Sequence, residues 1–321
     1  MLETSEIKNI LIIGITGGLA QITAKIISKK MPGVNIIGID VRDVGNIPPI
    51  PGLTCQKVKY SRGNFEKIFR SHDLDVVLHL GRITHANAAS QNVHKRLDLS
   101  VVGTNTILDL CMKSSIKKIV ILSTFHVYGA YPDNPVFIKE DAPLRASIKY
   151  PDLRDVVEMD QIATNWVWKN QNQIKGVVLR PCNIIGAQIK NTISQYLAYK
   201  YAPYPIDFNP IFQFIHEYDM AHVIYRSITE VPTGTYNVAP NEYISLKNAL
   251  KKLETPGIPI PVSVVGSIAG FLKSFRRGIP EYLIDYIKFS CLIDNSELKK
   301  HLGEDFCKFK IGDALKLINL R

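Results

Sequence analysis

The sequence predicts an α/β protein built on a doubly wound parallel sheet. Short, nearly all-apolar runs alternate with helix-like segments through the first half of the chain, which is the pattern of strands that helices cover on both faces. In such a sheet, ligands bind in the crevice at the carboxyl ends of the strands. The expected strands are residues 10–13, 35–40, 75–80, 118–122 and 176–179, and the expected helices are residues 21–30, 104–113 and 156–168.

The alternation loosens after residue 180. Prolines and aromatic residues gather at 201–205, and prolines gather again at 257–261. We therefore expect residues 1–180 to form the sheet domain and residues 181–321 to form mainly a smaller C-terminal substrate lobe, with some segments returning to the sheet.

Composition limits the class of partner. The chain carries a formal net charge of +10, but its basic residues are spread thinly and do not interleave with aromatic residues, so nucleic acid is not expected. The N-terminus lacks the apolar run of a signal peptide, and prolines interrupt the least charged later stretch, 255–272, so we expect a cytoplasmic protein without a membrane span. We interpret the basic segment 270–277 as a lobe helix with its charges in water rather than as a membrane-binding face.

The five cysteines are scattered along the chain and never form a C-x-x-C pair. This spacing argues against a disulfide framework and against a zinc site, and it is typical of reduced thiols in the cytosol. The sequence therefore predicts no bound metal.

A glycine-rich turn follows the first expected strand directly and opens the first expected helix. Glycines at such a bend let the backbone approach a pyrophosphate, which the free N–H groups and the dipole of the helix N-terminus attract. Asp40, at the end of the second strand, supplies an acceptor for a ribose 2′-hydroxyl, and its charge would repel a 2′-phosphate. The pattern therefore predicts a Rossmann-type site for NAD rather than NADP, although Arg42 lies nearby. The cofactor contacts expected from the turn are Gly14, Thr16, Gly17, Gly18 and Leu19.

Short motifs in a fixed order span nearly the whole chain. They are Gly14-x-x-Gly17, Asp75-x-Val77-x-His79-Leu80, Gly103-Thr104, Ser123-Thr124-x-x-Val127-Tyr128-Gly129, Glu140-Asp141-x-Pro143, Leu179-Arg180-Pro181-x-Asn183-x-x-Gly186, Phe214-Ile215-His216-x-x-Asp219-x-Ala221, Tyr236-Asn237-Val238 and Asp294-Asn295-Ser296. By this set the chain resembles the extended short-chain dehydrogenase/reductase family of NAD-dependent epimerases and dehydratases.

The resemblance implies roles for single residues. Thr124 matches the Ser or Thr that hydrogen-bonds the substrate oxygen being oxidised or reduced, and Asn183 matches a substrate-contacting position. Relatives also form homodimers through a four-helix bundle, which here would use residues 101–113 and 156–168. Positions that match the surroundings of the cofactor ribose and nicotinamide are Leu80, Gly81, Pro181 and Cys182.

The resemblance fails at the proton relay. The family uses a Tyr whose phenol pKa is lowered by a Lys four residues later, so that the phenolate can take a proton near neutral pH. One register pairs Tyr150 with Arg154, a cation that cannot deprotonate. The other pairs Asp152 with Val156, and we prefer it because Pro151 and the following helix then fall in step with the family pattern. In the preferred register, both the phenol and its ammonium partner are gone.

Three side chains are candidates for the proton chemistry. His126 lies two residues after Thr124 and titrates near neutrality, although a packed or solvent-facing His is the commoner case. Asp152 would serve as a base if it were buried beside the nicotinamide, but it is also well placed to cap the following helix. Tyr150 is the third candidate, if its loop brings it to the site.

The substrate side also departs from the family. Nucleotide-sugar epimerases place an Arg on the substrate diphosphate four residues before the His of the Phe-Ile-His motif, and that position here is Phe212. A second such Arg has no counterpart in residues 286–289. Losing both cations removes charge-assisted contacts worth about 1.5–3 kcal/mol each. The sequence therefore favours a small substrate, either sugar-derived or more apolar.

The sequence thus predicts an NAD-dependent epimerase/dehydratase-like oxidoreductase that acts on a hydroxyl or keto group of a small substrate through a non-standard proton relay. The alternative is a catalytically disabled NAD-binding protein that serves as a redox sensor or interaction module. Because the resemblance covers nearly the whole chain, we favour the enzyme.

Overall fold

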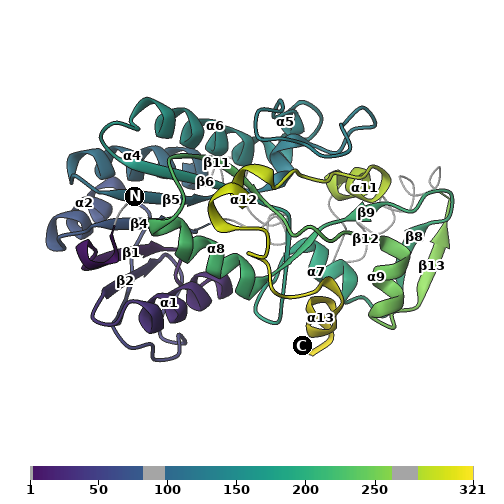
Figure 1. Ribbon diagram of the computed structural model, residues 1–321, viewed down its shortest axis with the longest axis horizontal. Helices are drawn as coiled ribbons and strands as arrows, with labels where there is room; N and C mark the ends of the chain where they lie inside the picture. Colours follow the sequence, from purple (N-terminus) through teal and green to yellow (C-terminus); the bar gives the residue numbers. More distant parts are fainter. Residues whose placement is uncertain (1–2, 82–97, 262–280, 321) are drawn as a thin grey trace.

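The computed structural model describes residues 3–81, 98–261 and 281–320. Its centre is a parallel sheet made of β1 (Asn9–Ile13), β2 (Asn35–Asp40), β3 (Leu53–Lys57), β4 (Val76–His79), β5 (Lys118–Leu122), β6 (Lys175–Pro181) and β11 (Gly234–Val238). The strand order is β11-β6-β5-β4-β1-β2-β3, and every neighbouring pair is parallel (Figure 1). The predicted doubly wound parallel sheet is confirmed.

Helices cover both faces of this sheet (Figure 1). They are α1 (Gly18–Lys30) and α8 (Glu217–Thr229) on one face, and α2 (Arg62–Ser71), α4 (Gly103–Lys113) and α6 (Arg154–Lys169) on the other. In β1, Ile10 and Ile12 pack with the first layer, whereas Leu11 and Ile13 pack with the second. Because successive strand side chains point to opposite faces, one apolar run serves both layers.

The second half of the chain adds β11 to the sheet beside β6 and also forms short strand pairs of its own. The boundary at residue 180 stays a prediction. The short pairs are β7 (Asn183–Ile185) with β10 (Phe214–His216), β8 (Ala202–Pro205) with β13 (Gly257–Ile260), and β9 (Ile211–Phe212) with β12 (Ile244–Ser245). The remaining α-helices that the structure describes are α5 (Ala146–Lys149), α7 (Thr192–Leu197), α9 (Leu246–Lys252), α11 (Glu281–Lys288), α12 (Ser296–Leu302) and α13 (Ile311–Lys316).

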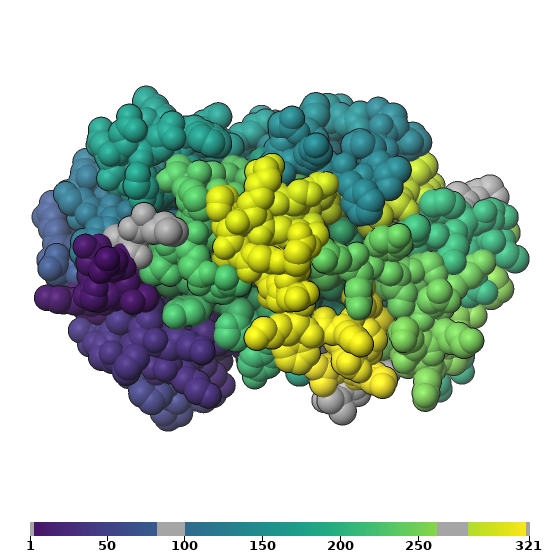
Figure 2. All heavy atoms as spheres, viewed as in Figure 1, coloured from purple at the N-terminus to yellow at the C-terminus, as the bar shows by residue number. Residues whose placement is uncertain are grey.

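Hydrogen bonds and a ring contact join the C-terminal segment to the start of α8. Asp219 accepts the backbone N–H groups of Lys308 and Phe309, each at 3.0 Å. The ring of His216 stacks on Phe309 with centroids 4.0 Å apart. Figure 2 shows the C-terminal residues (yellow) lying across the middle of the visible face. His216 and Asp219 therefore hold residues 308–309 of the C-terminal segment against the start of α8.

Four elements of the sheet layers, β3, β11, α2 and α8, are not among the strands and helices expected from the sequence. β3 is one of the two edge strands and has largely exposed side chains, so it lacks the apolar run of an inner strand. α2 begins after Ser61, whose hydroxyl accepts the N–H of Asn64 at 3.4 Å. In addition, α1 begins at Gly18 rather than at Gln21. The inner strands were thus easier to predict than the edge.

The expectations about a membrane span, a metal site and the basic segment can be compared only with the described residues. No helix in the described ranges is long and apolar enough to cross a membrane. Within the same ranges, no group of His, Cys, Asp and Glu side chains is arranged to hold a metal ion. The basic segment 270–277 lies outside the described residues.

Candidate active site

The glycine-rich turn after β1 lies tightly against the end of β4. Gly14 has a φ of +92°, and a Cβ at this position would lie only 2.5 Å from the Cα of Gly81. Its N–H donates to the carbonyl of Ile39 at 2.8 Å, while the buried Leu80 donates its N–H to Ile13 at 3.0 Å. Three strand ends therefore meet at the carboxyl edge of the sheet, where dinucleotides bind in folds of this kind.

The start of α1 supplies backbone donors at this edge. Gly17 is the N-cap, with an extended φ of −70° and ψ of 138°, so Gly18 and Leu19 begin the helix. The first N–H groups of a helix have no intrahelical acceptors, and the helix dipole makes this end attractive to an anion. Backbone N–H donors are thus available where the sequence predicts a phosphate-binding turn.

Asp40 ends β2 and is tied to the same turn. Its Oδ2 accepts the backbone N–H of Thr16 at 3.1 Å and the hydroxyl of Thr16 at 2.6 Å. Arg42 donates from its backbone N–H at 3.0 Å and from its guanidinium at 3.2 Å. Burial opposes ionisation of Asp40, but the hydrogen bonds from Arg42 and Thr16 outweigh it, so the pKa of this carboxyl is lowered. The carboxylate therefore carries a negative charge at the place expected for a ribose.

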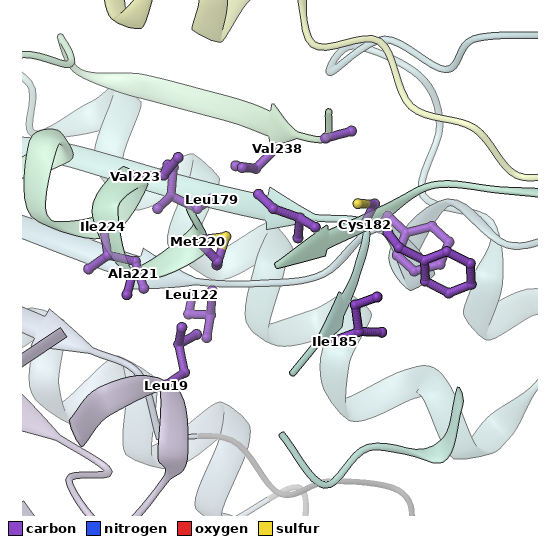
Figure 3. Close-up of a cluster of buried hydrophobic side chains, with 14 of the residues drawn as sticks. Leu19, Leu122, Leu179, Cys182, Ile185, Met220, Ala221, Val223, Ile224 and Val238 are labelled. Atoms are coloured by element: carbon purple, nitrogen blue, oxygen red, sulfur yellow. The ribbon is translucent and has the colours of Figure 1, made fainter. Parts of the chain in front are cut away.

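Pro181 and Cys182 lie where β6 ends beside β11. The N–H of Cys182 donates to the carbonyl of Val238 at 2.9 Å. Figure 3 shows Cys182 in one apolar cluster with Leu179 and Val238, and Leu19 of α1 faces the same cluster from below. Burial raises the pKa of the Cys182 thiol. The side chain is thus part of an apolar wall.

Thr124 and His126 form a hydrogen-bonded pair directly after β5. Thr124 begins the 3-10 turn Phe125–Tyr128, and its Oγ1 lies 2.9 Å from Nδ1 of His126. The hydroxyl of Tyr286 donates to the carbonyl of His126 at 2.8 Å, and the two rings pack with centroids 4.8 Å apart. This pairing places an imidazole against the hydroxyl that the family resemblance assigns to the substrate oxygen.

Tyr150 points to α11 and hydrogen-bonds a carboxylate there. Its hydroxyl donates to Oδ2 of Asp285, which also pairs with the ammonium of Lys149. Tyr150 and Asp285 are buried, at 7% and 5% exposure, whereas the side chain of Lys149 is 49% exposed. The ring of Tyr282 lies 6.5 Å from Tyr150 and 5.8 Å from His126, between centroids. α11 therefore contributes an acid and aromatic rings to this region.

The other relay candidates lie in different surroundings. Asp152 is exposed within the 3-10 turn Pro151–Leu153. The N-cap of α6 is Leu153, so Asp152 does not occupy the N-cap position that the sequence suggests for it. Arg154 is also exposed and pairs with Glu158 at 2.6 Å.

Val156 lies on the inner side of α6. It lines a small cavity of about 20 Å³ together with His79, Gly81 and Met159. Nε2 of His79 lies 3.0 Å from the hydroxyl of Thr104, and burial lowers the pKa of His79 to about 4. In the preferred register, Val156 replaces the family's Lys, and here it sets an apolar side chain near Gly81.

The substrate side of the strand ends is lined by amides and aromatic rings. Asn183 is buried and donates from Nδ2 to the carbonyl of Gln213 at 3.3 Å. Phe212 is buried and stacks on Phe214 with centroids 5.8 Å apart. Tyr286 is buried as well, and burial raises its pKa well above the usual value. The positions expected to hold diphosphate-binding cations are thus packed aromatic positions.

The buried ion pair of Arg180 with Asp160 contacts residues on both sides of the Thr124 turn. Arg180 donates to both carboxylate oxygens of Asp160, at 3.0 and 2.7 Å, and to the hydroxyl of Tyr128 at 2.8 Å. Ser123 donates to the same Asp160 carboxylate. The motif residues Ser123, Tyr128 and Arg180 therefore form one network, which the sequence motifs alone do not reveal.

The comparisons with known proteins agree with this architecture. The model of the NAD dependent epimerase/dehydratase family matches residues 10–239. An uncharacterised protein of Mycobacterium bovis is 25% identical over 243 residues, which cover 74% of this chain and 63% of the relative. A dTDP-D-glucose 4,6-dehydratase of Dictyostelium discoideum is 30% identical over 133 residues, covering 39% of this chain and 30% of the relative.

A solved structure shows the same fold. The UDP-glucose 4-epimerase of Bifidobacterium longum, in complex with NAD+ and UDP, superposes with a TM-score of 0.73 at 19% identity, covering 97% of each chain. The sequence match covers less than two thirds of the length of the M. bovis relative, 63%.

The family match extends from β1 to the end of β11, and so includes the glycine-rich turn, Asp40 and Thr124. It confirms the resemblance drawn from the motifs, and the NAD dependence in the family's description agrees with the predicted cofactor. The chain belongs to the NAD-dependent epimerase/dehydratase family.

Proposed function

We propose that this protein is an NAD-dependent oxidoreductase of the epimerase/dehydratase type that acts on a hydroxyl or keto group of a small substrate. The observation that carries the proposal is the pair of Thr124 and His126, with Oγ1 and Nδ1 2.9 Å apart. The pair follows β5, whose parallel neighbour β4 ends at His79, two residues before Gly81. It therefore lies on the same sheet edge as the glycine-rich turn, which packs against Gly81.

The residues at the turn fit NAD. Gly14 lets the turn pack directly against Gly81, and the start of α1 offers N–H groups to a pyrophosphate. A carboxylate offers about four lone-pair positions, and Asp40 already accepts five donor groups from Thr16 and Arg42. A ribose hydroxyl would therefore take the place of the guanidinium of Arg42, whose side chain is exposed. The bound cofactor would accept a hydride from the substrate carbon and, in an epimerisation, return it.

The proton would leave through the chain's own side chains. The substrate hydroxyl would donate to Oγ1 of Thr124, whose own proton would pass to Nδ1 of His126 as the carbonyl forms. His126 suits this role because a neutral imidazole that carries its proton on Nε2 can accept a hydrogen bond at Nδ1. The contacts of Tyr286 to the carbonyl and ring of His126 hold the imidazole in place.

The substrate class follows from what surrounds the pair. Phe212 and Tyr286 stand where charge-assisted contacts to a diphosphate would be expected, which favours an uncharged group there. The substrate is therefore a small hydroxyl or keto compound, sugar-derived or more apolar. The Dictyostelium and Bifidobacterium relatives are named for nucleotide sugars, so these compounds belong in any test.

The alternative is a non-catalytic NAD-binding protein that acts as a redox sensor or interaction module. It is favoured by two observations: the hydroxyl of Tyr150 is engaged by Asp285, and Val156 is apolar at the position of the family's Lys. Both functions require NAD at the glycine-rich turn, and they differ only in turnover.

The test uses purified protein with NAD+ and a panel of UDP-glucose, dTDP-glucose, free hexoses and secondary alcohols. NADH formation is followed at 340 nm, and isomers are separated by chromatography. Thr124→Val and His126→Phe should each lower kcat by about 10²–10⁴-fold, with unchanged affinity for NADH, because they remove one step of the same proton transfer.

The comparison variants are Tyr150→Phe and Asp152→Asn. If Tyr150→Phe abolishes turnover while His126→Phe does not, the proton acceptor is Tyr150. If wild-type protein binds NADH tightly but turns over nothing in the panel, the non-catalytic alternative takes the place of the proposal.

A further inference from the structure

The turn after β7 presses against the first residue of α1. A Cβ on Gly18 would lie 2.5 Å from the carbonyl oxygen of Gln188 and 2.7 Å from its Cβ. Real Cβ atoms do not approach backbone this closely, so the contact requires glycine at position 18. Gln188 thus begins its side chain directly beside the helix end that the proposed function assigns to a pyrophosphate.

A buried carboxylate fixes this position of Gln188. Its N–H donates to Oε2 of Glu217 at 2.9 Å, and Glu217, the first residue of α8, is only 2% exposed. Gly186 has a φ of +157°, and a Cβ there would lie 2.2 Å from the carboxylate carbon of Glu217. Two glycines and one buried acid therefore hold the turn, while Gln188 itself is exposed.

We propose that Gln188 is a cofactor-binding residue whose side-chain amide donates a hydrogen bond to the pyrophosphate of NAD. The inference rests on the NAD site of the proposed function and adds to it a residue from the second half of the chain. It also gives the turn 186–188 a reason to be fixed: the backbone of Gln188 is held by Glu217, and its amide is left to reach the ligand.

The chemistry of the side chain fits this role. A Gln amide offers two N–H donors and no charge, so it binds a phosphate oxygen without adding a cation to the site. A carboxylate in its place would repel the diphosphate, and an ammonium would attract it. Affinity for a diphosphate should therefore follow the charge at position 188.

The experiment titrates NADH fluorescence with wild-type protein and three variants, Gln188→Ala, Gln188→Glu and Gln188→Lys. Gln188→Ala should raise Kd about 2–10-fold, which is the range for a lost hydrogen bond, and Gln188→Glu should raise it more than tenfold. Gln188→Lys should bind at least as tightly as wild type. ADP-ribose, which carries the same diphosphate, should show the same order in competition.

Gln195 on α7 provides the matched control because it is also an exposed glutamine in the second half of the chain. Gln195→Glu and Gln195→Lys make the same charge changes and should leave Kd within twofold of wild type. Equal thermal unfolding of all variants shows that the fold is intact, as expected for exposed side chains.

The failures are distinguishable. If wild-type protein does not bind NADH at all, the proposed function falls together with the inference. If wild type binds NADH and the three variants at position 188 bind it equally well, or if the Gln195 variants change Kd by the same factors, only the role of Gln188 is overturned.

Discussion

The hydroxyl of Thr16 donates to the carboxylate of Asp40 at 2.6 Å, which ties the glycine-rich turn after β1 to the end of β2. The same carboxylate also accepts from Arg42, whose side chain is 63% exposed. One acid therefore holds the turn in shape and restrains the cation closest to the expected ribose. Its removal should affect cofactor choice as well as cofactor affinity.

Replacing Asp40 by Ser should invert the preference for NADH over NADPH. The variant loses a charge-assisted acceptor for the ribose, and it releases Arg42 to bind a 2′-phosphate. We expect Kd for NADH to rise about 10–100-fold and Kd for NADPH to fall, both measured by fluorescence titration. Asp43→Ser, at an exposed acid in the same loop, is the control for net charge. An unchanged ratio of the two Kd values would remove Asp40 from the cofactor site.

Gly14→Ala should destabilise the protein more than Gly33→Ala does. Both glycines have positive φ, +92° and +90°, so both variants carry the cost of a left-handed residue, about 1–2 kcal/mol. Only at Gly14 would the new Cβ also meet Gly81, whereas nothing lies within 4 Å at Gly33. Overpacking adds about 1–3 kcal/mol. Urea unfolding measures the difference, and equal losses would show that the contact with Gly81 relaxes without cost.

The sequence revealed those parts of the fold in which local pattern and tertiary role agree. β5 has the predicted bounds, 118–122, because an inner parallel strand is apolar on both faces. β3 was missed because an edge strand such as Leu53–Lys57 needs no continuous apolar run. The apolar pattern of a sequence therefore predicts the inner strands of a sheet better than its edge strands.

The candidate site was only partly predictable for a different reason. The glycine-rich turn and Thr124 are local motifs, and the structure places them at one sheet edge. Asp285 and Tyr286 contact residues more than a hundred positions away, so no local spacing links them to Tyr150 or His126. Asp285, the acid among the apolar and aromatic residues 282–287, was the available signal, and its partner could not be derived from it.

Asp285→Ala should cost more stability than Lys149→Met. The first change leaves the buried hydroxyl of Tyr150 without its acceptor, which costs about 1–3 kcal/mol. The second removes a half-exposed ammonium, and exposed pairs contribute about 0–1 kcal/mol. The double variant Asp285→Ala with Tyr150→Phe should recover part of the loss, because it removes the donor as well. Denaturant unfolding tests this, and strictly additive losses would show that the Tyr150–Asp285 bond does not stabilise α11.

The buried His79 should make the protein lose stability as the pH falls from about 6.5 to about 4. Burial lowers its pKa to about 4 in the folded chain, from the ordinary value of 6.5 that the unfolded chain approaches. Between these values the unfolded state binds the proton and the folded state does not, so protonation favours unfolding. The full effect is about 3 kcal/mol, and it is present above pH 6.5 and lost towards pH 4.

His79→Gln tests this directly, because an amide can keep a hydrogen bond to Thr104 but does not titrate. The free energy of unfolding of the variant, measured in urea at pH 7, 5.5 and 4.5, should fall less steeply than that of wild type. His301→Gln, at an exposed His, serves as the control. If wild type and His79→Gln lose stability in parallel across this range, the pKa of His79 is the same in the folded and the unfolded chain, and its burial does not disfavour the charged imidazole.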